Sequence, residues 1–270
     1  MWDVVIARLK QGNRTVSYPK GEPALPEMYR GLPVIDAARC PSGCRECVDA
    51  CPTQAIKTDG QGLKVDLGRC LFCTDCADAC PEKAFTYSRE FRMAACKKED
   101  LIVVIPAEAG TQSNGLGPAF RRGDVTLAKV QALDAKMLKL FGRSLKLRQV
   151  SAGGCNGCEA DVNVLNTIVY DLGRFGIQFV ASPRHADGLL ITGPVTENMK
   201  SALLETYAAV PAPKIVIAVG ACAISGGPYI DHPEVHNGAD SIVPVDLYIP
   251  GCPPHPLTIL DGLLRLLDRI

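Results

Sequence analysis

The sequence predicts two differently built parts: a small cysteine-rich α+β part, and a doubly wound α/β part with a parallel sheet toward the C-terminus. Three observations support this prediction. Two short cysteine motifs, each ending in Cys-Pro, follow one another between residues 40 and 81. From about Leu145 onward, apolar runs of strand length alternate with helical stretches. All but one of the 13 cysteines fall into three sets of four.

The composition is that of an ordinary globular chain of 270 residues, long enough for two domains. Apolar residues make up 47%, and 29 basic residues balance 29 acidic ones. No basic stretch is interleaved with aromatic residues, so we expect no nucleic-acid partner. The start shows no signal-peptide pattern, and apolar runs such as 215–219 are too short to span a bilayer. We therefore expect a reducing cytoplasmic setting without a transmembrane segment or signal peptide.

Residues 1–33 are predicted to form an extended docking arm, because four prolines interrupt them. The arm opens with a short amphipathic helix, in which Trp2, Val5, Ile6 and Leu9 share one face. This face either docks on a neighbouring protein or lies on a membrane surface or membrane subunit. We favour the first interpretation.

Residues 34–96 contain an internal repeat, in which each half is expected to hold a cysteine-rich loop, a proline, a short helix and a β-ribbon. The halves carry two spaced motifs: Cys40-x3-Cys44-x2-Cys47-x3-Cys51-Pro52 and Cys70-x2-Cys73-x2-Cys76-x3-Cys80-Pro81. Thiolate is the natural ligand of iron–sulfur clusters, and in such motifs the cysteine before proline binds the other cluster. We expect two ligand sets: Cys70, Cys73, Cys76 and Cys51 for one cluster, and Cys40, Cys44, Cys47 and Cys80 for the other.

This region resembles the bacterial two-cluster ferredoxin over about sixty residues. It departs from that pattern at Pro41-Ser42-Gly43, which places three residues rather than two between the first two cysteines. Gly43 is expected to absorb the extra residue in a tight turn. The alternative for both motifs is zinc or unbound thiols.

Residues 97–144 are predicted to be a connector. It contains a short strand at Ile102–Ile105, a mobile loop at Gly110–Gly117 and an amphipathic helix at Val125–Phe141 with Gly142 as its C-cap. This helix is expected to pin one part of the chain against the other.

Residues 145–270 are predicted to form a doubly wound, flavodoxin-like sheet. The expected strands are Leu145–Val150, Ile177–Ala181, Gly188–Thr192, Lys214–Val219 and Val245–Ile249. The expected helices are Asp161–Phe175, Thr196–Ala208 and Pro256–Leu267.

The third cysteine set is dispersed over this sheet. Cys155 and Cys158 follow the first strand, Cys222 the fourth and Cys252 the fifth. Loops after parallel strands gather at one edge of the sheet, so these four cysteines are predicted to bind one cluster there. Flanking glycines let the backbone approach it closely.

These motifs resemble the small-subunit family of energy-converting NiFe hydrogenases and of respiratory complex I. The resemblance rests on Ser151–Glu159, Ser182–Asp187, Gly220–Gly227 and Ile249–Pro254. Two residues separate Cys155 from Cys158, as in the hydrogenase branch, and the chain is most similar to formate hydrogenlyase-type enzymes. The resemblance implies a flavodoxin-like fold and a cluster close to the active site of a separate large subunit. It also implies that the ferredoxin-like part, a separate subunit in those complexes, is fused here.

The function implied is that of a non-catalytic electron-transfer subunit of an oxidoreductase, with three 4Fe-4S clusters. The implied partners are a NiFe large subunit, membrane antiporter-like subunits, and a donor or acceptor such as formate dehydrogenase or ferredoxin. The implied location is peripheral, on the cytoplasmic side of the membrane. Two alternatives remain open: a complex I-like module serving quinone or another acceptor, and a soluble ferredoxin fusion acting alone as a carrier.

Several other residues could take part in chemistry or have simpler structural roles. Glu159 is either a proton-transfer carboxylate beside a ligand or a helix N-terminal charge. Arg184 and His185 are expected at a large-subunit interface, and His232 and His236 are not expected to bind a metal as a pair. His255 is expected in a surface loop, and Cys96 is expected to be a buried small apolar residue.

Overall fold

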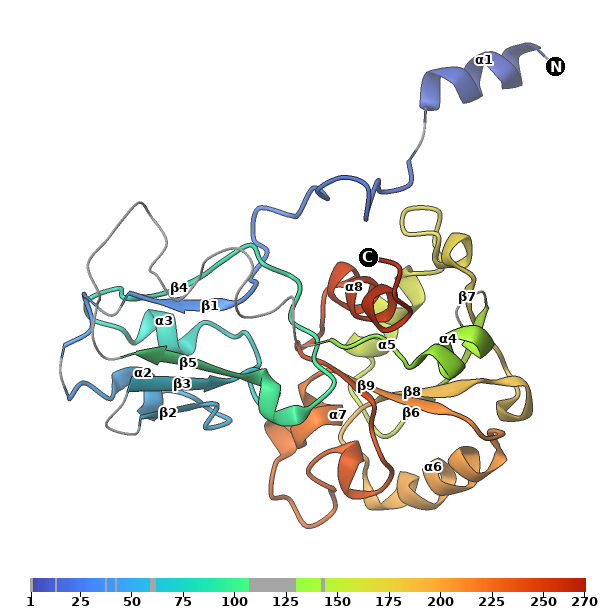
Figure 1. The fold of residues 1–270 in the computed structure, drawn as a ribbon. Helices are drawn as coiled ribbons and strands as arrows, with labels where there is room; N and C mark the ends of the chain where they lie inside the picture. The colour runs from blue at the N-terminus through green and yellow to red at the C-terminus, as the bar shows by residue number, and fades with distance from the viewer. Residues whose placement is uncertain are drawn as a thin grey trace.

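Figure 1 shows the computed structural model of the chain, with a small part built on short strands beside a larger part built on a parallel sheet. The structure describes residues 2–12, 14–36, 38–41, 43–58, 62–106, 130–141 and 144–270. The predicted loop at 110–117, residues 125–129 of the predicted helix and Gly142 lie outside these ranges.

The small part has two antiparallel sheets; α3 is drawn between them, and α2 beside β2 and β3 (Figure 1). One sheet pairs β1 with β4, and the other has the order β2-β3-β5. The elements are β1 (Pro33–Ile35), α2 (Glu46–Asp49), β2 (Ile56–Thr58), β3 (Gly62–Asp66), α3 (Asp75–Asp78), β4 (Phe85–Tyr87), a 3₁₀ helix (Lys98–Leu101) and β5 (Ile102–Pro106).

Two details of this part differ from the expectation. Each short helix lies inside its cysteine motif and ends before the Cys-Pro pair, whereas the repeat pattern predicts it after the proline. The strand expected in the connector, β5, pairs antiparallel with β3 and so extends the sheet of the small part. Its pairing partner is about forty residues away, which is why local sequence patterns did not reveal it.

The larger part is a five-stranded parallel sheet in the order β10-β9-β8-β6-β7. Read from the β7 edge and numbered along the chain this is the order 2-1-3-4-5, so the predicted flavodoxin-like, doubly wound sheet is confirmed. The strands are β6 (Leu145–Ser151), β7 (Ile177–Phe179), β8 (Gly188–Thr192), β9 (Ile215–Val219) and β10 (Leu247–Ile249).

Helices cover both faces of this sheet, with α5 and α8 on one face and α6 on the other (Figure 1). The helices are α4 (Ala135–Phe141), α5 (Gly157–Val164), α6 (Glu197–Ala209), α7 (Ala221–Ser225) and α8 (Pro256–Leu266), with short 3₁₀ turns at 172–175, 183–185, 227–229 and 239–241. Successive residues of β8 point to opposite faces of the sheet. Leu190 packs on the face covered by α8, and Leu189 and Ile191 pack on the face covered by α6.

Two predicted helices are shorter than expected. The stretch 161–175 forms α5 only to Val164, and the chain then turns tightly into the 3₁₀ helix at 172–175. The Thr167 hydroxyl donates to the Val164 carbonyl at 2.7 Å, a side-chain bond that competes with helix continuation. The second, α4, begins at Ala135, where Asp134 accepts a hydrogen bond from the Met137 N–H as an N-cap.

The two parts share one hydrophobic cluster. It joins Leu67 and Leu101 of the small part to Ile224 and Tyr248 of the larger part. Ala95 exchanges two backbone hydrogen bonds with Tyr248, at 3.0 and 2.8 Å. The Ser225 hydroxyl donates to the Gly68 carbonyl, and Lys98 pairs with Asp240 at 3.0 Å. The parts are therefore packed against each other.

The first helix, α1 (Trp2–Gln11), has no buried residue and projects away from the rest of the chain (Figure 1). Its Trp2 and Leu9 side chains are 78% and 77% exposed, so the apolar face predicted from the sequence lies open to solvent in this structure. Among the described residues, no helix has both the length and the apolar character needed to cross a bilayer.

Candidate iron–sulfur sites

The eight cysteines of the small part line two separate hollows in a crossed arrangement. The three upstream cysteines of the second motif line one hollow together with the last cysteine of the first motif: Cys70, Cys73, Cys76 and Cys51. The other hollow is lined by Cys40, Cys44, Cys47 and Cys80. The structure thus brings together the same two sets of four that the motif predicted.

Both Cys-Pro turns aim a backbone N–H at the sulfur of the cysteine that crosses over. The Ala55 N–H donates to Cys51 Sγ at 3.2 Å, and the Ala84 N–H donates to Cys80 Sγ at 3.3 Å. The preceding residues, Gln54 and Lys83, have positive φ angles of 51° and 49°. Hydrogen bonds to sulfur tune the reduction potential of an iron–sulfur cluster. The sequence gives no sign of these left-handed turns, because neither residue is a glycine.

The extra residue after Cys40 lies in a turn closed by a hydrogen bond from the Cys44 N–H to the Pro41 carbonyl at 3.2 Å. Gly43 has a φ of 79°, a conformation that side chains disfavour. Cys40 still lines the same hollow as Cys44 and Cys47.

The third set gathers at the carboxyl ends of β6, β9 and β10, as open α/β sheets place their ligand sites. Burial raises the pKa of the Cys158 thiol, and the nearby Cys222 and Cys252 raise it further. Burial also raises the pKa of Cys222 to about 12, with added effects of Cys252 and Cys155. These four thiols therefore lie within electrostatic reach of one another. Binding a metal there requires their deprotonation.

Two glycines keep space open around these sulfurs. Gly220 and Gly227 have positive φ angles of 92° and 56°. A Cβ atom on the first would collide with the sulfur of Cys158, and one on the second with that of Cys222. The glycines, the thiol ligands and the hollows all suit a bulky sulfur-ligated cluster. Within the described residues, no three His, Cys, Asp or Glu side chains are close enough to hold a single metal ion.

Neighbouring cysteines also indicate the order of the three sets. Cys76 contributes to the raised pKa of Cys47, after burial and Cys40, which places the two small-part sets side by side. Phe72, which precedes Cys73, lines the same hollow as Gly251 and Pro253, which flank Cys252. In keeping with this, burial, Cys155 and then Cys73 raise the pKa of Cys252. The set containing Cys73 therefore lies between the other two.

Glu159 is buried beside the third set, with 7% of its surface exposed. Its Oε1 accepts hydrogen bonds from the Ser151 and Thr192 hydroxyls, each at 2.6 Å. Burial alone would raise the pKa of Glu159, but these two hydrogen bonds outweigh it and the pKa lies below the usual value. The side chain is thus fixed between two strand ends rather than turned to solvent.

The remaining candidates lie apart from the cysteine sets or have structural roles. Arg184 and His185 lie on a 3₁₀ turn without burial. His236 bonds Glu197 at 2.5 Å, while His232 accepts from the Glu234 N–H, so the two histidines have different partners.

Two expectations about single residues need correction. His255 is not a free loop side chain: it caps α8 by accepting from the Leu257 N–H at 3.2 Å, and burial lowers its pKa. Cys96 is only partly buried, and its sulfur lies 3.6 Å from the Gln131 carbonyl.

A two-cluster ferredoxin fold joined to a flavodoxin-like sheet with cysteines at its carboxyl edge defines an iron–sulfur protein of the electron-transfer class. Residues 155–266 match the family described as NADH ubiquinone oxidoreductase, 20 Kd subunit, and residues 38–84 match the 4Fe-4S dicluster domain. The chain belongs to this 20 Kd subunit family and carries the dicluster domain ahead of it.

Three relatives illustrate the range of this family. A probable membrane-bound hydrogenase subunit of Pyrococcus furiosus is 43% identical over 136 residues, covering 50% of this chain and 81% of the relative. Formate hydrogenlyase subunit 7 of Escherichia coli is 45% identical over 162 residues, covering 58% and 64%. An NADH-quinone oxidoreductase subunit of Clostridium beijerinckii is 46% identical over 114 residues, covering 42% and 68%.

Proposed function

We propose that this chain relays electrons through three 4Fe-4S clusters to or from the NiFe site of a partner large subunit in a membrane-associated hydrogenase of the formate hydrogenlyase type. The observation that carries the proposal is the order of the cysteine sets. The second set (Cys51, Cys70, Cys73 and Cys76) lies beside the third across the junction of the two parts, where Phe72, Gly251 and Pro253 line one hollow. Such an order provides a path from the ferredoxin-like part to the exposed Cys155 and Cys252.

The proposed ligands are the twelve cysteines of the three sets. The first cluster would be held by Cys40, Cys44, Cys47 and Cys80, the second by Cys51, Cys70, Cys73 and Cys76, and the third by Cys155, Cys158, Cys222 and Cys252. When bound, each cluster supplies a one-electron carrier. The chain itself supplies the thiolates and the N–H groups of Ala55 and Ala84. One cysteine of each set, Cys47, Cys76 or Cys222, is buried.

The proposed partners are those implied by the resemblance to energy-converting hydrogenases. They are a NiFe large subunit against the third set, antiporter-like membrane subunits, and an electron donor or acceptor such as formate dehydrogenase or a ferredoxin. The chain would sit peripherally on the cytoplasmic side of the membrane. Glu159 would serve proton movement at the boundary with the large subunit.

The test is the Cys252→Ser variant, purified anaerobically in its native complex. The purified wild-type chain should contain about twelve irons, four for each cluster, and the variant complex should contain about four fewer irons than the wild-type complex. Hydrogen-linked activity should vanish, while the electron paramagnetic resonance signals of the two ferredoxin-type clusters persist. Cys96→Ser is the matched control and should keep the full iron content. Activity near wild type in Cys252→Ser would refute the proposed path.

A second candidate is an electron-transfer subunit of a complex I-like oxidoreductase without hydrogenase activity. The similarity to the NADH-quinone oxidoreductase subunit of Clostridium beijerinckii favours it. The partner large subunit decides between the two: two CxxC pairs for nickel support the hydrogenase, and their absence supports the complex I-like module.

A further inference from the structure

The arm between α1 and β1 is fastened to both parts of the molecule. At its beginning, the Thr15 hydroxyl and the Val16 N–H donate to the carbonyls of Ile168 and Val169, both at 2.8 Å. These two carbonyls belong to the turn that follows α5, and they are available because the helix ends early. Arg174 adds bonds to the carbonyls of Val16 and Tyr18 at 2.8 and 2.9 Å.

Tyr18 contacts both parts at once. It is 5% exposed, and its hydroxyl donates to Asp261 of α8 at 2.5 Å. Asp261 is itself buried and is neutralised by Arg265, whose Nε lies 3.0 Å from the carboxylate. The Tyr18 ring packs edge-on against Phe91 of the small part, with centroids 5.5 Å apart.

The later half of the arm binds the small part. Arg89 donates to the carbonyls of Leu25 and Pro26 at 2.6 and 3.1 Å. The Gly31 N–H donates to the Ser88 carbonyl at 2.8 Å. A Cβ atom on Gly31 would collide with the backbone of Glu90, so the arm lies as close to this segment as a glycine permits.

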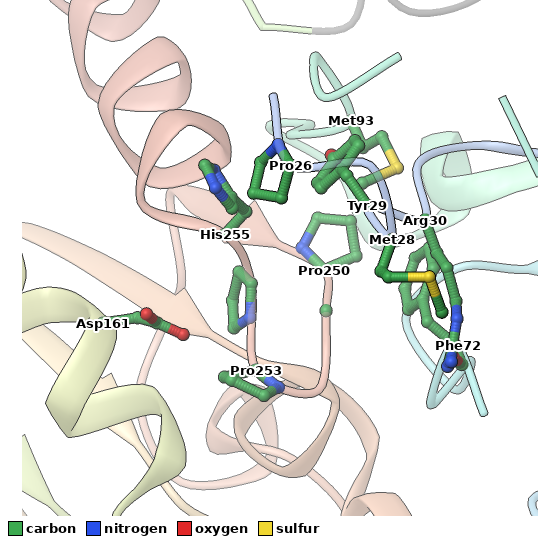
Figure 2. A pocket seen from close by; sticks show the side chains of 12 residues that line it. Pro26, Met28, Tyr29, Arg30, Phe72, Met93, Asp161, Pro250, Pro253 and His255 are labelled. Carbon is green, nitrogen blue, oxygen red and sulfur yellow. The ribbon is translucent and has the colours of Figure 1, made fainter. Parts of the chain in front are cut away.

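Two consecutive arm residues contact the loops of two different cysteine sets. The Tyr29 ring packs edge-on against His255, three residues after Cys252, with centroids 5.2 Å apart. Arg30 donates to the carbonyl of Phe72, which precedes Cys73, at 2.8 Å. Figure 2 shows these four side chains around one hollow, which Gly251 and Pro253 also line.

We infer that the arm is a strap whose Tyr29 and Arg30 hold the Cys73 loop and the Cys252 loop at a fixed separation. These two residues are positioning residues: they act on the electron path through the loops that carry the ligands. The inference rests on the proposed function, because it assumes clusters in the second and third sets.

The test uses the full chain with Tyr29→Leu and Arg30→Met combined, which removes the ring contact and the bond to Phe72 while keeping apolar volume. The exposed Lys20→Met in the same arm is the matched control. Two measurements are needed: magnetic interaction between the reduced second and third clusters, and amide hydrogen exchange in residues 70–73 and 251–255. We expect the double variant to lose the magnetic interaction and to exchange faster in both loops, with unchanged iron content.

Wild-type interaction and wild-type exchange in the double variant would overturn the strap. If the double variant loses iron, Arg30→Met alone and Gly31→Ala, which displaces the strap through its backbone, are compared in the same way. A wild-type chain lacking the third cluster would refute the proposed function instead, and the exchange of the two loops would still decide whether the strap positions them.

Discussion

At the scale of single residues, the sites depend on atoms that a cysteine pattern does not include. Gln54 and Lys83 adopt left-handed conformations at equivalent places in the repeat, and each directs the next N–H to a crossing cysteine. The spacing of a motif identifies the thiols, whereas the backbone conformation determines which hydrogen bonds reach them. Those bonds are formed in the folded loop and have no signature in residue type.

His255 should make the stability of the chain depend on pH. Burial lowers its pKa from 6.5, so in the folded chain the ring stays neutral and accepts the Leu257 N–H. Below about pH 6.5 the unfolded chain binds a proton that the folded chain resists, and the free energy of unfolding falls. His255→Asn keeps a cap acceptor that does not titrate. Between pH 7.5 and 5.5, the unfolding temperature of this variant should therefore fall by ~2–4 °C less than that of the wild type.

His185→Asn is the control, because that histidine lies on a 3₁₀ turn without burial. It should retain the full wild-type pH dependence. An equal pH dependence in His255→Asn and wild type would show that the buried cap does not titrate as stated.

At the scale of elements, the central parallel strands β8 and β9 were predictable because each is a short apolar run bounded by polar or glycine residues. β8 and β9 are buried along their whole lengths, which gives the continuous apolar signal of strands covered on both faces. The end of α5 was not predictable in the same way. The Thr167 hydroxyl bonds the Val164 carbonyl there, and the turn that follows binds the arm through the Thr15–Ile168 hydrogen bond, which joins residues 153 positions apart.

The helix α1 should contribute to assembly and not to the stability of the chain. Deleting residues 2–12 while retaining Met1 removes no buried side chain and no proposed ligand, so the unfolding temperature and iron content should stay unchanged. Recovery of the native complex should fall, because the deletion removes the exposed apolar face through which the chain is expected to dock. Co-purification of the large subunit measures this loss. Undiminished recovery would contradict the docking role. Tight binding of the isolated chain to plain liposomes would also contradict it, because an apolar face this short should have only marginal affinity for lipid.

At the scale of the whole molecule, the candidate ligands were predictable and the junction between the parts was not. The shared cluster around Leu67, Leu101 and Ile224, and the two bonds between Ala95 and Tyr248, join distant segments. The sequence pattern favours residues 125–141 as the segment that pins the two parts together. In the described part of that range, the Leu133 N–H donates to the Leu266 carbonyl at 3.0 Å and the Gln131 carbonyl lies 3.6 Å from Cys96 Sγ, so this role stays a prediction. The arm makes further contacts with both parts.

Cleavage within Gly110–Gly117 should therefore leave the two halves bound to each other. The N-terminal fragment would keep the arm and its bonds to the larger part, together with the shared apolar cluster. Size-exclusion chromatography of the nicked chain under native conditions should give one peak at the position of the uncut chain. Electron transfer between the halves should remain largely unchanged. Release of a free ferredoxin fragment would instead mean that the halves are flexibly tethered.

The crossed arrangement of Cys51 and Cys80 has a consequence for how this chain is built and inherited. Neither half of the repeat lines a hollow with its own four cysteines, so in the proposed clusters each half would lend one ligand to the other. The halves therefore have to be matured together, and a gene cut between them would encode two fragments that each leave a cluster one ligand short. In this sense the two motifs of the repeat are interlocked, and neither would complete a cluster without the other.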